Sequence, residues 1–224
     1  MKRVVFCFIL LAIIFLNSLS TEAQSITDID GNTYPIVKIG SQTWTLKNLE
    51  VTRFRNGDEI PEAKSLKKWD NAGNEGKPAW CYYGYNAENG IKYGKLYNYY
   101  AISDPRGITP EGWHIPSDLE WTALTDTLGG AISAGDSLKC KSGWDLNSDN
   151  ITDFYAHQGF CGLPGGICNH SGGFYGIGDI GAWWSSTWSR EDIAWSRNLY
   201  FNSKSVSRDG VYKRVGLSVR LVKD

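Results

Sequence analysis

The 224-residue sequence has a net charge close to zero, a single methionine and few long apolar runs. It contains 23 basic and 24 acidic residues, whereas a nucleic-acid-binding protein ordinarily presents a basic face. This balance argues against a nucleic-acid partner. After position 16 no stretch is apolar enough to cross a membrane. Ten tryptophans, twelve tyrosines and 25 glycines accompany the single methionine, a composition that favours a loop-rich extracellular domain over a helical bundle.

Several motifs of common enzymes are also missing. The sequence has no nucleophile elbow, no zinc-protease helix motif and no phosphate-binding loop that ends in Gly-Lys. The glycine-rich stretch 160–181 is not followed by Lys-Ser or Lys-Thr, so it predicts loop geometry and not a phosphate cradle. No familiar catalytic class is therefore indicated by motif.

The first 23 residues have the pattern of a secretory signal peptide. Lys2-Arg3 is followed by an apolar run over residues 4–16 and by a short polar segment with small residues that ends at Ala23. The run is shorter than the roughly 20 residues of a membrane-spanning helix. We expect cleavage after Ala23, which leaves residues 24–224 as one domain with a net charge of −2 and no transmembrane segment. The expected location is secreted, periplasmic or at the cell surface.

Beyond the predicted signal peptide the chain has four cysteines. An even number in an exported protein predicts disulfides, for which three pairings are possible. The favoured pairing is Cys161–Cys168, which would close a short glycine-rich loop, together with Cys81–Cys140.

The clearest helix is predicted just after Ser117. Ser117 is a suitable N-cap, and Glu120 stands where its carboxylate can complete a capping box. Trp121, Leu124 and Leu128 then form one apolar stripe, and two glycines follow. Shorter helices are predicted near 62–69 and 132–138, and residues 95–102 fit either a strand or a helix. Strands are predicted at 33–39, 42–46, 182–187, 194–201 and 216–222.

Seven motifs in order resemble one known family. They are DIDGNTY, VKIGSQTWTLKNL, YGKLYNYYAI, GWHIPSDLEWTAL, GFCGLPGG, WWSST and GLSVRLVKD. Together they resemble the Fibrobacter succinogenes major paralogous domain over residues 28–224. This resemblance implies an exported bacterial protein but no established activity.

A more distant resemblance bears on the fold. Residues 114–121, HIPSDLEW, are similar to the RLPTEAEW signature of the formylglycine-generating (sulfatase-modifying) family, and GLSVR at 216–220 is similar to that family's GFRV ending. The Trp183-Trp184 pair also resembles the variable proteins of diversity-generating retroelements. These groups imply an α+β, C-type-lectin-like fold with small twisted antiparallel sheets, two helices and long structured loops. Within it, His114 and Glu120 would be structural.

The same resemblance argues against one activity. Formylglycine-generating enzymes use a copper-binding cysteine pair near the C-terminal end of the domain. No cysteine follows Cys168 here, so the thiolates that copper(I) requires are missing.

Two groups of residues have partial metal-site patterns. A zinc set is conceivable from His157, Cys161, Cys168 and His170, although a disulfide with two surface histidines explains them better in an oxidising compartment. The start of a calcium loop is visible in Asp145, Asn147, Asp149 and Asp153. Asn150 and Ala156, however, replace the glycine and glutamate that such a loop needs, which favours a solvated acidic loop. We expect no metal and no other cofactor.

The tryptophan-rich region after residue 182 is the best candidate for ligand contact. Strand alternation would send Trp183 and Trp184 to opposite faces, so the two are not expected in the same core. Aromatic rings with polar neighbours suit sugar binding. The candidate binding residues are Trp188, Arg190, Tyr200, Asn202 and Lys204.

The expected function is that of an exported, non-catalytic binding module for a glycan or protein ligand. The alternatives are a structural or adhesive surface protein and an enzyme on the formylglycine-generating scaffold. The sequence does not determine the oligomeric state.

Overall fold

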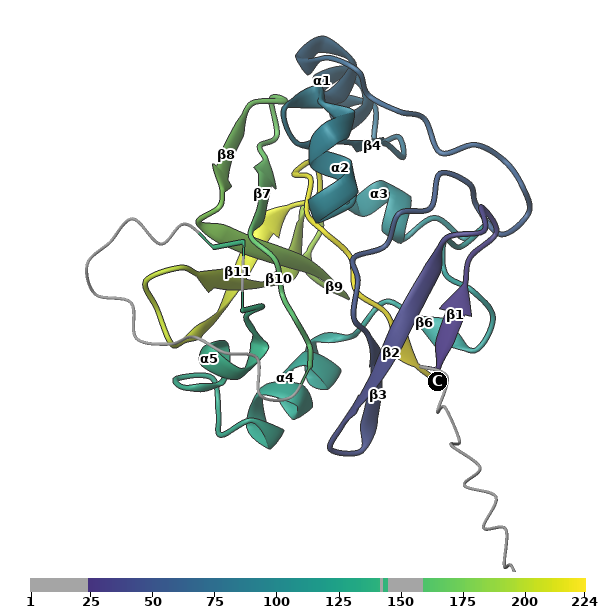
Figure 1. Ribbon diagram of the computed structural model, residues 1–224. Coiled ribbons are helices and arrows are strands. Elements are labelled where there is room, and N and C mark those ends of the chain that lie inside the picture. The colour runs from purple at the N-terminus through teal and green to yellow at the C-terminus, as the bar shows by residue number, and fades with distance from the viewer. Residues whose placement is uncertain (1–23, 142, 145–158) are drawn as a thin grey trace, which may run out of the picture.

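The protein has an α+β fold of small antiparallel sheets with short helices around them (Figure 1). The computed structural model describes residues 24–141, 143–144 and 159–224. The fold class expected from the sequence is thereby confirmed at the level of α+β. Five α-helices lie in the described residues, more than the two expected, but only α1 (Leu66–Asn74) and α4 (Asp118–Thr127) have nine or more residues.

The first sheet has five strands in the order β1-β2-β3-β12-β6. The hairpin of β2 and β3 turns at Gly40, whose φ of 59° lies in the left-handed region that glycine adopts easily. This hairpin was predicted from the alternating pattern and the Gly-Ser turn. The bounds are β1 Ser25–Thr27, β2 Thr33–Ile39, β3 Gln42–Thr45, β6 Trp113–His114 and β12 Val222–Lys223.

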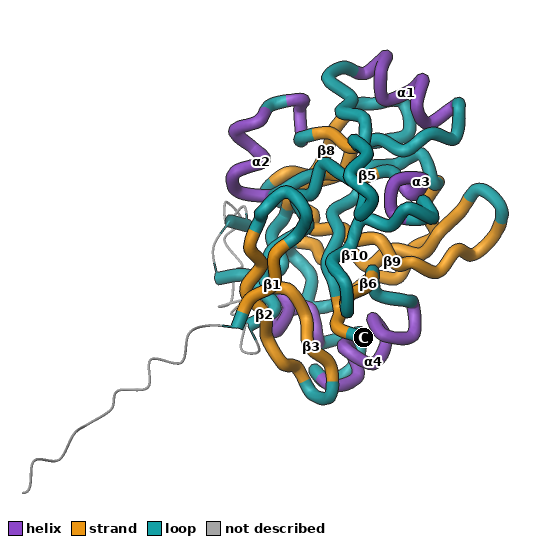
Figure 2. The backbone as a smooth tube through the Cα atoms, turned by 90° about the vertical axis from the view of Figure 1, so that its right-hand side faces the viewer, coloured by secondary structure: helices purple, strands orange, loops and turns teal. Residues whose placement is uncertain are grey.

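The second sheet has the order β11-β10-β9 and contains the two longest strands of the described residues, β9 and β10, which are labelled in Figure 2. They are β9 (Ile180–Arg190), β10 (Ile193–Tyr200) and β11 (Val206–Tyr212). Trp183 and Trp184 lie next to each other on β9 and are both buried, in two different hydrophobic clusters. The predicted split between the two faces is therefore confirmed. The third strand was missed, because its polar sequence resembles a loop.

Two short ribbons and the remaining helices complete the fold. β4 (Trp80–Cys81) pairs with β5 (Leu96–Tyr97), and β7 (Gly165–Cys168) pairs with β8 (Phe174–Ile177). The region 95–102, which fitted either a strand or a helix, contains both, because β5 is followed directly by a helix. The other helices are the 3-10 helix η1 (Tyr83–Tyr85), α2 (Ala87–Tyr93), α3 (Tyr99–Ile102) and α5 (Ala134–Leu138).

Helix α4 begins and ends as its sequence predicts. The Ser117 hydroxyl accepts from the Glu120 N–H, and the Glu120 carboxylate accepts from the Ser117 N–H at 2.7 Å, which makes a complete capping box. After Leu128, two glycines with positive φ end the helix. Trp121 and Leu124 are buried in one cluster with Trp44, Phe160 and Trp183, and Leu128 packs at its edge. The helix thereby covers one side of the second sheet.

Residues 215–222, which we call the central segment, lie at the centre of the molecule and are all buried. The sequence predicts one strand here, but only β12 at its end belongs to a sheet ladder. The rest forms single bridges or backbone bonds with β7 at Gly216, with β5 at Leu217, with β9 at Ser218 and with Leu49 at Val219. In Figure 1 this yellow segment runs through the middle of the molecule, between the other elements. One segment therefore joins four parts of the fold.

The cysteine pairing favoured from the sequence is wrong. The disulfide joins Cys140 and Cys161, while Cys81 and Cys168 are buried as free thiols. The reason is local: the Cys140 N–H donates to the Gly162 carbonyl, and the Gly162 N–H donates to the Leu138 carbonyl, so these two segments run side by side. The extended strand β7 meanwhile carries Cys168 away from Cys161.

Candidate functional site

One tryptophan differs from the others in its exposure. All ten tryptophans lie in the described residues, and eight of them are buried. Trp195 is half-buried beneath the guanidinium of Arg208, which lies 3.4 Å from the ring centroid. Trp188 is 61% exposed. Trp188 is therefore the tryptophan whose ring is most accessible to a ligand.

Trp188 lies near the end of β9, where the hairpin turns into β10. The ammonium of Lys213 lies 5.4 Å from the centroid of its ring, within the range of a cation–π contact. Arg190 and Asp192 form a 3.8 Å ion pair at the turn and are both largely exposed. We refer to Trp188, Arg190, Asp192 and Lys213 as the hairpin tip. It presents one aromatic face surrounded by hydrogen-bonding groups of both charges.

The base of the hairpin tip is rigid. The Tyr99 hydroxyl donates to the Ser186 carbonyl at 2.5 Å, and burial raises the pKa of Tyr99 to about 12, so this bond persists at physiological pH. The Tyr99 ring also packs edge-on against the buried Trp184. Trp188 is thus held on a strand anchored to the core.

The structure does not bring the five predicted binding residues together. Trp188 and Arg190 lie at the turn between β9 and β10, whereas Tyr200 ends β10 and Asn202 and Lys204 follow it. A strand rises about 3.3 Å per residue, so β10 separates the two groups by roughly 20 Å or more. Lys204 instead lies 3.8 Å from Asp136 of α5. The five residues belong to two surfaces.

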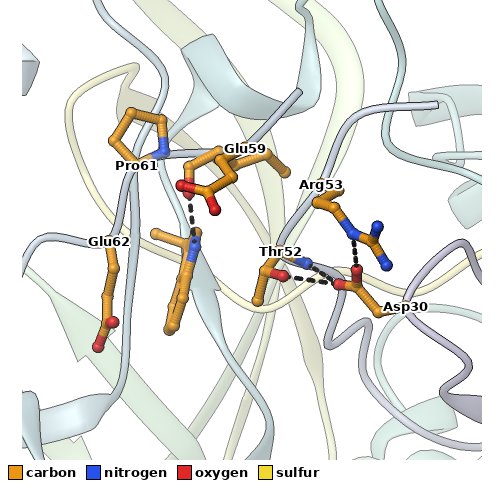
Figure 3. Close-up of a pocket in the computed structure, with 8 residues that line it drawn as sticks. Asp30, Thr52, Arg53, Glu59, Pro61 and Glu62 are labelled. Carbon is orange, nitrogen blue, oxygen red and sulfur yellow. Dashed lines mark hydrogen bonds and ion pairs between the residues drawn. The ribbon is translucent and has the colours of Figure 1, made fainter. Parts of the chain in front are cut away.

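A second candidate is a pocket of about 520 Å³ that has an acidic lining (Figure 3). Its residues come from the turn before β2, the chain after β3, the following loop and β4. We call this site the polar pocket; it is lined by Asp30, Thr52, Arg53, Glu59, Ile60, Pro61, Glu62 and Trp80.

Asp30 is the most firmly held side chain of the polar pocket. Its carboxylate accepts from the Thr52 N–H and, at 2.8 Å, from the Thr52 hydroxyl, and it pairs with the Arg53 guanidinium at 2.5 Å (Figure 3). Partial burial on its own would raise the pKa of Asp30, but the bonds from Thr52 and Arg53 lower it below its ordinary value. Asp30 is therefore a fixed anion and a poor proton donor at neutral pH.

The other side of the polar pocket is formed by Trp80 and Glu62. The Trp80 N–H donates to the Ile60 carbonyl at 2.9 Å, which fixes the ring. Behind it, the Lys95 ammonium lies 4.9 Å from the ring centroid, and burial lowers the pKa of Lys95. Glu62 pairs at 3.3 Å with the exposed Lys64. The pocket thus offers carboxylate acceptors, guanidinium donors and one aromatic wall, a set that suits a hydroxyl-rich ligand.

Sequence reasoning missed the polar pocket. Residues 28–32 form a polar turn in which the Asp28 carboxylate accepts from the N–H groups of Asp30 and Asn32. Nothing in the sequence shows that Asp30 reaches Arg53, 23 residues further on. Only the fold makes that contact visible.

The metal-site patterns find no support in the described residues, where no group of three or more His, Cys, Asp or Glu side chains could hold a metal ion. The zinc set cannot assemble as written, because Cys161 is in a disulfide and His157 lies outside the described residues. His170 is exposed, with its ring 6.2 Å from that of Tyr212. The calcium residues Asp145, Asn147, Asp149 and Asp153 also lie outside the described part.

None of the helices in the described residues has both the length and the hydropathy of a membrane span.

Comparison with known proteins identifies the family and nothing further. No curated protein matches this chain. No solved structure matches it either. The model of the Fibrobacter succinogenes major domain matches residues 37–223, which include both the hairpin tip and most of the polar pocket. The chain therefore belongs to the Fibrobacter succinogenes major domain family.

Proposed function

We propose that this chain is an exported, non-catalytic module that binds a glycan at the bacterial cell surface or in the periplasm. The observation that carries the proposal is the exposure of Trp188, in a protein that buries eight of its ten tryptophans. Holding a large indole in water on a rigid hairpin forgoes the free energy of burying it, about 2–3 kcal/mol for a large apolar side chain. A ligand that covers the ring would recover that free energy.

The chemistry around Trp188 favours a sugar. The apolar face of a pyranose ring stacks on an indole, while its hydroxyls need donors and acceptors at the rim. Lys213 and Arg190 supply donors, and Asp192 supplies an acceptor. The polar pocket adds a second site with the same chemistry. A glycan of several sugar units is the ligand class that fits such sites.

The arrangement of the polar pocket favours binding over catalysis. The Asp30 carboxylate is engaged by Thr52 and Arg53, and its pKa is lowered, so it is suited to accept hydrogen bonds and not to deliver protons. The structural or adhesive function and the formylglycine-type enzyme remain alternatives, which self-association by light scattering and oxygen consumption with copper analysis would reveal.

We also propose that the fold is C-type-lectin-like. Support comes from β12, which pairs with β3, so that an early hairpin and a late strand share one sheet. Superposing an experimental structure on lectin-like domains tests this assignment.

The test is a glycan array probed with the purified residues 24–224 and three variants. Trp188→Ala removes the exposed ring, Glu62→Gln changes the polar pocket with little change in size, and Tyr175→Ala is the matched control, since Tyr175 is an exposed aromatic on β8. We expect binding of at least one glycan by the wild type and the control, with at least a tenfold loss in Trp188→Ala.

Each result has a separate meaning. Loss in Glu62→Gln but not in Trp188→Ala would move the contact site to the polar pocket. If no glycan binds and a pull-down captures a protein through Trp188, the ligand class is wrong. If neither variant differs from the wild type in any binding assay, the proposed module has no ligand at these surfaces.

A further inference from the structure

The two free thiols lie in one buried cluster. Cys81 ends β4 and Cys168 ends β7, and both side chains have no exposed surface. They share a hydrophobic cluster with Trp69 and Leu96. Two strands bring them there: β4 pairs with β5 at Leu96, and Cys168 forms a bridge with Gly216 of the central segment. Residues 87 positions apart are thereby placed on the same side of residues 215–222.

Cys81 and Cys168 are neighbours in this cluster, where both are fully buried as free thiols. Burial and the neighbouring thiol raise the pKa of Cys81 well above its ordinary value. Tyr85 packs against the same cluster, and its hydroxyl donates to the Gly172 carbonyl at 2.9 Å. A thiolate is therefore disfavoured, and the folded pair is not suited to act as a nucleophile or a redox catalyst.

The state of the other cysteine pair bears on this one. Cys140 and Cys161 are joined in a disulfide, so the chain's chemistry is that of a protein that matures under oxidising conditions. Under such conditions two buried thiols in one cluster are the ordinary precursors of a disulfide. Among the three pairings of four cysteines, Cys140–Cys161 leaves only Cys81 with Cys168.

We propose that Cys81 and Cys168 form a second disulfide, which joins β4 to β7 in the mature protein. The two thiols lose two protons and two electrons as the S–S bond forms. The disulfide of a thiol–disulfide oxidoreductase accepts both and becomes a dithiol. The bond forms during folding, while the thiols are still accessible, and is shielded afterwards by the aromatic rings of Trp69, Tyr85 and Phe174.

This cross-link would enclose the other one. The loop from Cys81 to Cys168 contains the Cys140–Cys161 loop within it, so the two bonds are nested. The outer bond restrains a much longer stretch of the unfolded chain, and in the chain-entropy description longer loops give the larger stabilisation. The second disulfide is therefore expected to contribute at least as much to thermal stability as the first.

Thiol counting tests the proposal directly. Residues 24–224 are exported to an oxidising compartment or refolded in a glutathione buffer, then denatured and alkylated without reductant. We expect no alkylated cysteine and a non-reduced peptide that links Cys81 to Cys168. Alkylation of both Cys81 and Cys168 in protein whose Cys140–Cys161 bond is intact would overturn the proposal. A peptide linking either residue to Cys140 or Cys161 would overturn it as well.

Melting temperatures provide a second measurement that does not depend on peptide recovery. The double variant Cys81→Ser and Cys168→Ser is compared with the wild type, with and without a reductant that opens buried disulfides, and the matched control is Cys140→Ser with Cys161→Ser. If the bond exists, the difference between wild type and variant shrinks on reduction, because both then lack it. A difference unchanged by reduction would show that the thiols contribute only packing, and would contradict the proposal.

Discussion

At the scale of single residues, Arg220 is the largest charged side chain that is fully buried in the described structure. Its guanidinium donates to the side chain of Asn48 and to the carbonyls of Thr45, Phe160 and Cys161, at 2.7–2.8 Å. None of these partners is a carboxylate. The cation is therefore stabilised by dipoles and by the ring of Phe160, whose centroid lies 4.5 Å from the guanidinium carbon. Burial lowers the pKa of Arg220 to about 9. Its function is to tie the central segment to β3 and to the chain before β7.

Replacing Arg220 should be strongly destabilising. Arg220→Met keeps the length of the side chain but leaves several buried acceptors without donors, each at a cost of about 1–3 kcal/mol. We expect the free energy of unfolding to fall by about 3 kcal/mol or more, measured by urea denaturation. Arg220→Lys should not restore it, since one ammonium cannot reach acceptors in four directions.

The matched control is Arg190→Met, because Arg190 is largely exposed and its ion pair is long. A loss for Arg220→Met no larger than that of the control would refute the structural role.

His114 should make stability depend on pH. Burial on its own would lower its pKa, but bonds to Asp224 at 2.5 Å and Glu120 at 2.7 Å raise it above the ordinary value of 6.5. Because the folded pKa is raised, the stabilisation is complete below pH 6.5 and is lost as pH rises through the folded value. We expect urea midpoints to decrease from pH 6 towards pH 8.5.

His114→Asn should flatten this pH profile. The effect will be modest, because the His114 side chain is partly exposed and solvent screens the pairs. A midpoint that rises with pH in the wild type but not in His114→Asn would be the opposite of the prediction.

At the scale of elements, Asp118 attaches helix α4 to the second sheet. Its carboxylate pairs with Arg197 of β10 at 2.7 Å and with Arg208 of β11 at 2.8 Å. Arg197 is almost fully buried, and Arg208 is half exposed over the ring of Trp195. Asp118, the first residue of α4, therefore neutralises the charge of the buried Arg197 guanidinium.

Asp118→Asn should lower the free energy of unfolding more than the loss of the Ser117 N-cap does. The neutral amide leaves the buried Arg197 without a counter-charge, a change that typically costs about 3 kcal/mol or more. Ser117→Ala, which removes a cap, should cost about 1 kcal/mol, and Arg208→Ala should cost less than about 1 kcal/mol because that partner is half exposed. Denaturant titration of the three variants checks the order. An equal loss for all three would mean that the ion pair adds nothing to the cap.

Prediction from sequence succeeded where the signal is local. The capping box of α4, the exit glycines and the β2–β3 hairpin each lie within one short stretch of chain, and all three are confirmed. It was less exact where the partner is distant. Strands β5 and β12 have two residues each, so their bounds depend on the remote segments that pair with them and do not follow from the local pattern.

The same distinction applies to the candidate site. Trp188 was chosen from its position in a tryptophan-rich strand, and its exposure agrees with that choice. The polar pocket was not foreseen, because Asp30, Arg53, Glu62 and Trp80 meet only through tertiary contacts. The cysteine pairing failed for the same reason, since sequence proximity says nothing about which extended segments run side by side.

At the scale of the whole molecule, residues 215–222 hold the sheets together. Backbone bonds run from Leu217 to Tyr97 and from Trp184 to Ser218, and a Cβ at Gly216 would lie 2.8 Å from the Trp69 ring. Position 216 therefore has no room for a side chain. The several small sheets therefore share one buried partner and should unfold together.

Hydrogen exchange should reveal this shared partner. The amides of Tyr97 and Trp184 donate to this segment, and the amides of Leu217 and Ser218 donate from it to the carbonyls of Tyr97 and Ala182. We expect all four to exchange only through global unfolding, with equal protection factors under native conditions. If Tyr97 and Trp184 exchange at clearly different free energies, the molecule contains separate folding units.

The position of this segment in the chain has a consequence for biosynthesis. It follows every element that it joins, so during vectorial synthesis or translocation the preceding residues emerge without the partner they require. Contacts of such long sequence separation also make folding slow. Nascent chains shorter than about 215 residues should thus stay accessible to proteases. For an exported protein, as proposed above, folding would then be completed only after the chain has crossed the membrane.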